Sequence, residues 1–210
     1  IYAESSFMKV SGLRVAPLAP DVERAIALLS TAKKPVLLAG GGVMLSEAWA
    51  ELTALAETLL IPVVTSMAGK GGIADIHPLS VGASGRYSRK VANTVLSEAD
   101  FVLAVGTRLS SMSTDVFKYP RKGTRIVHLD LDPGTLGRTY REELSMIGDA
   151  RTALVMLREA ASAAKVNGSR WAAWTKEVQG QVAAWLVDLE RESRQPLLDG
   201  KLNPYHIMRL

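Results

Sequence analysis

Short runs of consecutive apolar residues alternate along the chain with segments in which apolar residues recur every three or four positions. The first pattern is typical of strands buried on both faces of a parallel sheet, and the second of amphipathic helices. The apolar runs predict strands at residues 36–39, 61–65, 101–105, 125–130 and 145–147. Helical spacing predicts helices over residues 20–32, 46–59, 89–99 and 150–164. The alternation predicts parallel βα units with helices on both faces of one sheet.

We therefore expect an α/β fold, a doubly wound, mostly parallel, six-stranded Rossmann-like sheet, followed by a C-terminal amphipathic linker helix. The stretch from His77 to Gly85 has no clear period and is expected to be irregular. The linker helix is indicated by apolar residues at helical spacing: Trp171, Trp174, Val178, Val182, Trp185 and Leu189. Its three tryptophans need a surface to bury against. They either pack on this domain or cover a neighbouring domain or subunit.

The ends of the chain lack the pattern of the middle. Residues 1–18 have no period and are expected to be a linker. Asn203 and Pro204 suit the cap and first turn of a further helix, and the apolar residues up to Leu210 then have no later segment to pack on. We expect a piece of a longer protein. The alternative is a native C-terminal turn.

Composition narrows the function classes. The 210 residues carry a formal net charge of +4, include no cysteine and include three widely spaced histidines. The positive charge is spread along the chain, which does not favour nucleic-acid binding. Disulfides and thiolate metal sites are excluded, and no histidine spacing suggests a metal site. Without an apolar run long enough to span a membrane and without a signal-peptide pattern, a cytoplasmic protein is expected.

Glycines follow the expected strands and invite a comparison with nucleotide-binding motifs. Gly40-Gly41-Gly42 follows the first strand, but the third glycine of a G-x-G-x-x-G motif is replaced by Leu45. The second strand ends in Thr65-Ser66 rather than near an acidic residue, so a standard NAD site is disfavoured. The Gly69-Lys70-Gly71 loop lacks the frame of a phosphate-binding P-loop.

Polar side chains at the same expected edge suit the phosphates and ribose of a nucleotide. These are Thr65, Ser66, Ser84, Arg86, Arg108 and Asp130. The alternative is that the glycines only make tight turns and the arginines are solvated. No nucleophile elbow is present, and Asp75 and His77 point apart if their segment is extended. No histidine–carboxylate pair is suggested at a fixed spacing, so we expect no catalytic and no metal-binding residue in this chain.

Six ordered segments together resemble the central domain of thiamine-diphosphate-dependent enzymes of the acetolactate synthase, pyruvate oxidase and pyruvate decarboxylase type. The resemblance covers about residues 20–160. The segments are 34–43, 61–71, 77–93, 99–108, 128–133 and 148–150. It implies a three-domain parent that binds thiamine diphosphate and Mg²⁺ outside this chain and acts on a 2-oxo acid, as a homodimer or homotetramer. The implied division is a linker at 1–18, a central domain at 19–165, and a linker helix with the start of a third domain at 166–210.

The resemblance further implies that FAD or ADP occupies the central domain in a structural role. Transferred by position, the contacts are Gly40, Gly41, Thr65, Ser66, Met67, Gly82, Ala83, Ser84, Gly85, Arg108, Asp130 and Asp149. Two departures weaken the FAD interpretation. Leu109-Ser110-Ser111-Met112 replaces a Phe-Asp-Asp-Arg segment, and Tyr87 replaces a histidine. The alternatives are a stand-alone nucleotide-binding module without catalysis and an NAD-dependent oxidoreductase domain.

Overall fold

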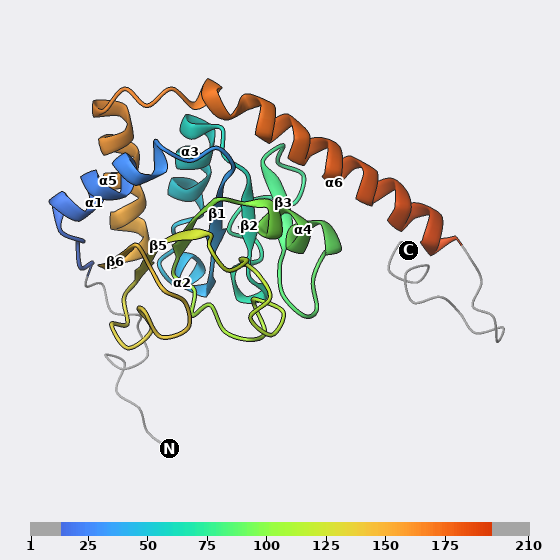
Figure 1. Cartoon of the computed structure of the whole chain (residues 1–210), viewed down its shortest axis with the longest axis horizontal. Coiled ribbons are helices and arrows are strands. Elements are labelled where there is room, and N and C mark those ends of the chain that lie inside the picture. Colours follow the sequence, from blue (N-terminus) through green and yellow to red (C-terminus); the bar gives the residue numbers. More distant parts are fainter. Residues whose placement is uncertain (1–13, 195–210) are drawn as a thin grey trace, which may run out of the picture.

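Six parallel strands form one sheet in the computed structural model, which describes residues 14–194 (Figure 1). The order of the strands across the sheet is β3-β2-β1-β4-β5-β6. Their bounds are β1 Pro35–Ala39, β2 Val63–Thr65, β3 Ser80–Ala83, β4 Phe101–Val105, β5 Arg125–Asp130 and β6 Leu144–Ile147. The doubly wound parallel fold expected from the alternating pattern is confirmed.

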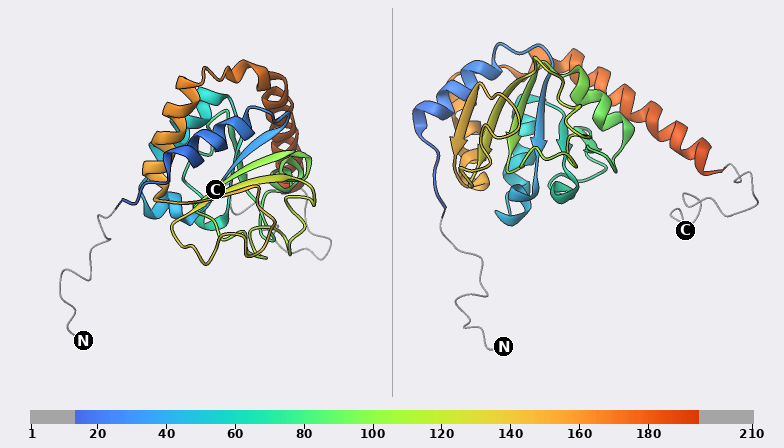
Figure 2. Two further views of the ribbon diagram at one scale, coloured as in Figure 1. Left: turned by 60° about the vertical axis from the view of Figure 1, so that its left-hand side comes forward. Right: turned by 60° about the horizontal axis from the view of Figure 1, so that its bottom comes forward.

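Helices cover both faces of the sheet, as the views in Figure 2 show. Their bounds are α1 Ala19–Leu29, α2 Gly41–Leu45, α3 Trp49–Leu59, α4 Lys90–Glu98, α5 Ala150–Ala163 and α6 Ala172–Ser193, with short 3-10 turns η2 Met67–Gly69 and η3 Gly168–Trp171. Helices α1, α3 and α5 pack on one face and build the larger hydrophobic core. Helices α4 and α6 pack on the other face. Alternate residues of each central strand point into the two cores, which explains the unbroken apolar runs in the sequence.

The direction of winding reverses between β1 and β4. Strand β1 pairs with β2 on one side and with β4 on the other, with Leu37 opposite both Val63 and Leu103. The loops after β1 and β4 therefore diverge to opposite sides and leave a crevice at the carboxyl edge of the sheet. This topology places the candidate site.

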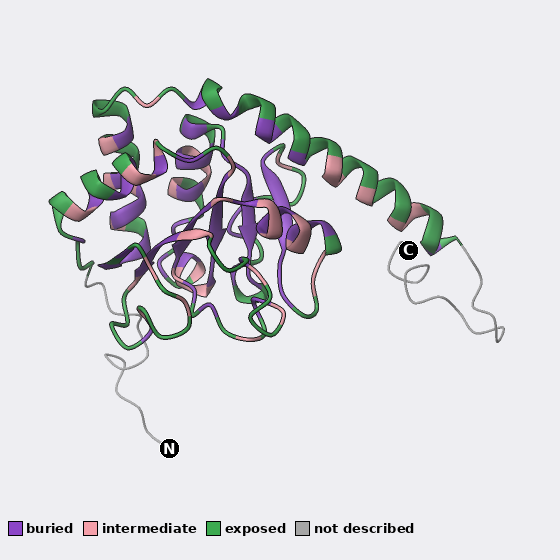
Figure 3. Cartoon of the chain, in the orientation of Figure 1, coloured by how far each residue is buried: buried purple, intermediate pink, exposed green. Residues whose placement is uncertain are grey.

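The linker helix packs on this domain through its first half, where the burial colours in Figure 3 show buried residues. Trp171 is 1% exposed and donates from Nε1 to the Ala32 carbonyl, 2.9 Å away. Trp174 is 4% exposed and donates to the Pro35 carbonyl at 3.0 Å. Trp185 is partly buried, and the Arg89 guanidinium lies 5.3 Å from its ring centroid. Of the two alternatives, packing on this domain accounts for Trp171 and Trp174.

Four elements depart from the expected pattern. Strand β3 lies in the stretch that was expected to be irregular. The sequence shows no strand pattern there, because the only large apolar residue of β3 is Val81 and Gly82 has a φ of 99°. Helix α2 occupies the expected glycine turn, and the second long helix begins at Trp49 rather than at Ser46. The second strand begins two residues later than predicted, after Pro62, which lacks the N–H that a ladder requires.

Residues 14–18 contact the end of the sheet. Arg14 and Val15 both bond to Asp149, and Pro17 packs against Gly148. The expected start of a third domain at Asn203 lies outside the described residues. Within residues 14–194, no helix has the length and apolarity needed to cross a membrane.

Candidate functional site

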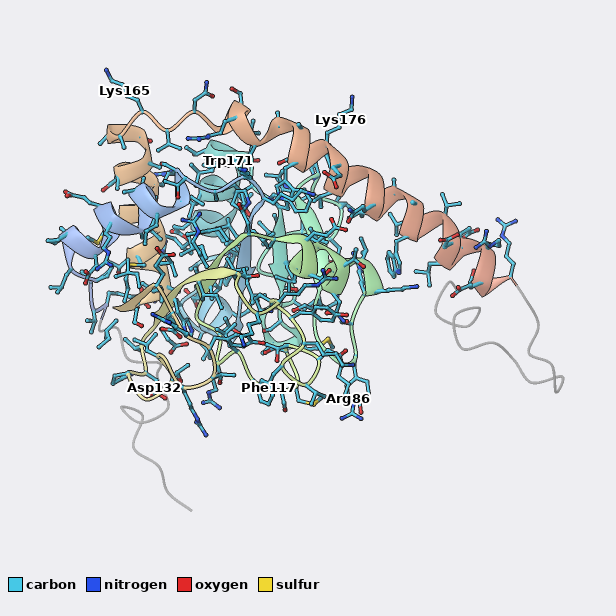
Figure 4. All side chains as sticks on the ribbon, viewed as in Figure 1. Arg86, Phe117, Asp132, Lys165, Trp171 and Lys176 are labelled. Carbon is cyan, nitrogen blue, oxygen red and sulfur yellow. The ribbon has the colours of Figure 1, made fainter. Side chains whose placement is uncertain are left out.

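A cavity of about 580 Å³ opens at the carboxyl edge of the sheet, over the crevice between β1 and β4. It is lined by Gly41, Gly42, Leu45, Ser46, Ser66, Met67, Ala68, Tyr87, Gly106, Thr107, Arg108, Ser110, Met112, Ser113, Asp130, Leu131, Asp132, Gly148 and Ala150. Figure 4 shows Asp132, Phe117 and Arg86 along this edge, with Trp171 at the opposite end of the domain. Its volume lies within the roughly 300–1,000 Å³ typical of small-molecule and cofactor sites.

The glycine turns beside the cavity are explained first by packing. A Cβ on Gly40 would lie 2.1 Å from the Gly106 carbonyl oxygen, and one on Gly42 would lie 2.7 Å from the Gly106 Cα. The N–H of Gly42 already donates to the Gly106 carbonyl at 2.9 Å. Gly40 and Gly42 are therefore needed because the turns after β1 and β4 touch, which the sequence analysis gave as the alternative to phosphate contact.

Five of the residues transferred from the family resemblance line the cavity: Gly41, Ser66, Met67, Arg108 and Asp130. Arg108 is exposed, and within residues 14–194 it is the only lysine or arginine that lines the cavity. Asp130 ends β5, and its Oδ1 accepts from the Asp132 N–H at 3.0 Å. The cavity therefore presents one cation, a small group of hydroxyls and two carboxylates.

The residues at the end of β2 and β3 do not line the cavity. These are Thr65, Gly82, Ala83, Ser84 and Gly85. Two of them contact the loop that does line it: the Ser84 hydroxyl donates to the Ser113 carbonyl at 3.0 Å, and a Cβ on Gly85 would lie 2.0 Å from the Met112 carbonyl oxygen.

Arg86, expected beside the glycine turns, also lies outside the cavity. It lines a second groove between the β3–α4 loop and helix α6.

Asp149 is buried under the cavity floor and caps α5. Its Oδ1 accepts from the Thr152 N–H at 3.1 Å, and its Oδ2 accepts from the Ser46 hydroxyl and from Arg14 Nη1, the latter at 2.9 Å. Burial raises the pKa of Asp149, but the hydrogen bonds from Ser46, Thr152 and Arg14 outweigh it and leave the pKa below its usual value. The position expected to contact a cofactor therefore has a structural role as well.

Sequence reasoning missed most of the apolar side chains around the opening. Leu45, Tyr87, Met112 and Leu131 line the cavity and are each at least half exposed. Leu45 ends helix α2 and the other three lie on three different loops, so no spacing in the sequence connects them. Leu131 and Asp132 were the most accessible to prediction, because they follow Asp130 directly at a strand end.

A buried histidine–carboxylate pair lies behind the cavity, where the spacing of the sequence had suggested none. His128 Nδ1 lies 2.6 Å from Glu142 Oε1, and His128 Nε2 lies 2.7 Å from the Thr107 carbonyl oxygen. The side chains of His128 and Glu142 are 1% and 3% exposed. Since both ring nitrogens are engaged and neither faces the cavity, the pair has no nitrogen available as a base toward a ligand there.

The other polar residues of interest are held apart. Asp75 pairs with Lys70 and Arg89, whereas His77 contacts Glu57 and the Leu79 N–H. Within residues 14–194, no three His, Cys, Asp or Glu side chains come together in a way that could hold a metal ion. Because Asp149 uses both of its oxygens within the fold, the described residues do not fit a magnesium–diphosphate site.

Comparison with known proteins identifies relatives over most of the sheet. A family model described as "Thiamine pyrophosphate enzyme, central domain" matches residues 22–157, more than half of the chain. The chain is 41% identical over 134 residues to a probable acetolactate synthase large subunit of Methanococcus aeolicus, covering 64% of the chain and 22% of that protein. It is 34% identical over 164 residues to the acetolactate synthase large subunit of Corynebacterium glutamicum, covering 78% of the chain and 26% of that protein.

A second kind of relative carries a different name. The chain is 34% identical over 142 residues to the glyoxylate carboligase of Escherichia coli O157:H7, covering 67% of the chain and 24% of that protein. The chain thus spans about a quarter of the length of the curated relatives it matches.

Proposed function

This chain belongs to the family of thiamine pyrophosphate enzyme central domains, and on that premise we propose that it binds an adenine nucleotide in a structural role within a longer enzyme. The longer enzyme is a thiamine-diphosphate-dependent protein that decarboxylates a 2-oxo acid and joins the product to an acceptor. The relatives named acetolactate synthase and glyoxylate carboligase support that reaction class.

One observation carries the nucleotide proposal: Arg108 and Asp130 line the same cavity, which lies where the direction of winding of the sheet reverses. Arg108 follows β4 and Asp130 ends the neighbouring β5, so the two side chains flank the cavity on adjacent loops. A guanidinium suits a phosphate, and a carboxylate accepts from ribose hydroxyls or the adenine amino group. The apolar rim suits the face of an aromatic ring.

The nucleotide is ADP, or an FAD that is retained weakly. The segment after Arg108 brings no charge to the cavity, since Leu109 is buried and only Ser110, Met112 and Ser113 of that segment line it. The flavin part of FAD therefore finds hydroxyls and a thioether where charged partners would hold it more strongly.

The chemistry of the parent enzyme belongs to domains outside this chain. Thiamine diphosphate and Mg²⁺ are held there, a proposal supported by the family of this chain. We propose the division into a linker at 1–18, a central domain at 19–165 and a linker helix leading to a third domain at 166–210. The parent assembles as a homodimer or homotetramer.

The nucleotide proposal is tested by titration calorimetry of the 210-residue chain with ADP and with FAD. Arg108→Ala and Asp130→Asn should each weaken ADP binding about tenfold, the loss expected when one charge-assisted hydrogen bond is removed. Arg24→Ala is the matched control, because Arg24 is exposed on α1 and does not line the cavity. ADP binding that is equal in all four proteins would place the nucleotide elsewhere.

The proposal that catalysis belongs to domains outside this chain is tested separately. The isolated chain, supplied with pyruvate, thiamine diphosphate and Mg²⁺, should form no acetolactate. Formation of acetolactate by this chain would overturn the proposal that its role is structural.

A further inference from the structure

The buried His128–Glu142 pair is not accounted for by nucleotide binding or by the fold alone. His128 lies in the middle of β5, and its ring joins two segments that the sheet does not join directly. One is the turn after β4, through the Thr107 carbonyl, and the other is the loop before β6, through Glu142. A polar pair that is almost fully buried is costly unless each group is hydrogen-bonded, so its protonation can be worked out from its partners.

The proton positions follow from what each partner can do. A carbonyl oxygen only accepts, so the Nε2 that contacts Thr107 carries a hydrogen. The contact between Nδ1 and Glu142 requires a second proton, on either the ring or the carboxyl group. Glu142 Oε2 also accepts from the Ser145 hydroxyl, which favours the carboxylate. With Glu142 ionised, His128 is an imidazolium that donates from both nitrogens.

The pKa of Glu142 agrees with this assignment. Burial raises that pKa, but hydrogen bonds from His128, Ser145 and the Gly137 backbone outweigh the burial and leave it below its usual value. The pair is then neutral as a whole, and its two charges compensate each other in a site closed to water.

The turn that His128 contacts is the one that carries the cation of the cavity. Gly106, Thr107 and Arg108 all line the cavity, and Leu109 follows with a φ of 45°. A leucine in the left-handed region is strained, so the surrounding structure must hold this turn in place. Two residues beyond His128, Asp130 brings its carboxylate to the same cavity.

We propose that His128 is a positioning residue for the nucleotide site. As a buried imidazolium held by Glu142, it donates to the Thr107 carbonyl and fixes the turn that presents Arg108 to the cavity. Glu142 in turn fixes the loop that follows Leu131 and Asp132, so one pair of side chains sets both walls of the site.

The protonation state is tested by ¹⁵N NMR of the imidazole rings. A chain with His77→Gln and His206→Gln leaves His128 as the only histidine. At pH 7 both of its ring nitrogens should show shifts typical of protonated nitrogen. An Nδ1 shift typical of an unprotonated nitrogen would overturn the proposal, and this measurement does not depend on any variant of Glu142 folding.

The positioning role is tested with Glu142→Gln, with Glu143→Gln as the matched control. Glu143 carries the same charge on the next residue and faces Arg125, with Oε2 4.0 Å from Nε. Glu142→Gln should shift the Thr107 carbonyl and Arg108 amide resonances, Glu143→Gln should not, and Glu142→Asp should restore them in part. Equal spectra for the Gln variants would refute the role.

The last arm rests on the proposed function: ADP binding should weaken about tenfold in Glu142→Gln relative to Glu143→Gln. If the unmodified chain binds no ADP while the NMR results hold, the proposed function fails, and His128 still positions the turn that presents Arg108 to the cavity. If the unmodified chain binds ADP and both Gln variants bind it equally, the positioning role fails and the proposed function stands.

Discussion

Two carboxylates beside the cavity should differ in their effect on stability. Asp149 is held by hydrogen bonds within the fold, whereas Asp130 is the one that we propose binds a ligand. Asp149→Ala removes an N-cap, which is worth about 1 kcal/mol. It also removes the acceptor of the buried Ser46 hydroxyl, and a hydrogen bond to a charged group is worth about 1.5–3 kcal/mol. The ion pair with Arg14 adds at most about 1 kcal/mol, because the Arg14 side chain is 34% exposed. We expect a total loss of roughly 2.5–5 kcal/mol.

Chemical unfolding in urea, followed by tryptophan fluorescence, measures this loss. Asp149→Asn keeps the cap and should lose only about half as much, since asparagine caps helices as well as aspartate does. Asp130→Asn is the control, because Asp130 lines the cavity and its side chain, among residues 14–194, accepts from the nearby Asp132 N–H alone. We expect it to leave the free energy of unfolding within about 0.5 kcal/mol of the unmodified chain.

The pH dependence gives an independent check. Because the pKa of Asp149 is lower in the folded chain than in the unfolded chain, its carboxylate contributes stability that is fully present above the unfolded pKa, about 3.9. That contribution is lost as the pH falls through the lower, folded pKa. The stability gap between the unmodified chain and Asp149→Asn should therefore be constant near neutrality and narrow below about pH 4. A gap under about 0.5 kcal/mol at pH 7 would refute the assignment of a structural role.

Three further changes test the packing. Gly42→Ala places a Cβ 2.7 Å from the Gly106 Cα and should cost about 1–3 kcal/mol, measured as a lower melting temperature; an unchanged temperature would show that the two turns are farther apart. Trp174→Phe removes the donor to the Pro35 carbonyl and should cost about 1 kcal/mol or more in urea unfolding, and no loss would contradict that bond. Leu186→Ser, at a residue 49% exposed, should change stability by less than about 0.5 kcal/mol; a larger loss would mean that this part of α6 is covered.

The fold was predictable where the sequence repeats a simple period. Strands β1 and β4 are unbroken apolar runs because helices cover both faces of the sheet, so every residue of these two strands is buried. Strand β3 was not predictable, because its residues are small and its pairing with β2 is irregular between Val63 and Val64. Its place in the sheet is set by β2 and α4 rather than by its own side chains.

The site was predictable only as an edge of the sheet. Arg108 and Asp130 could be named because each follows a recognisable strand, so the topology alone brings them together. His128 and Glu142 could not be paired, since the loop between them has no periodic pattern that would fix where Glu142 returns. Contacts made across a loop depend on the packed structure, and spacing in the sequence does not encode them.

The glycines of the turns and the side chains that line the cavity have different roles, and only the side chains can select a ligand. Gly40 and Gly42 are required by the touching of two turns, so any chain with this crossover needs them whether or not a nucleotide binds. The choice of ligand must then depend on the residues that face the cavity, above all the cation at Arg108, the carboxylate at Asp130 and the uncharged segment after Leu109. A relative with the same glycines and a charged residue in place of Ser110 should therefore hold a longer or more highly charged ligand than this chain does.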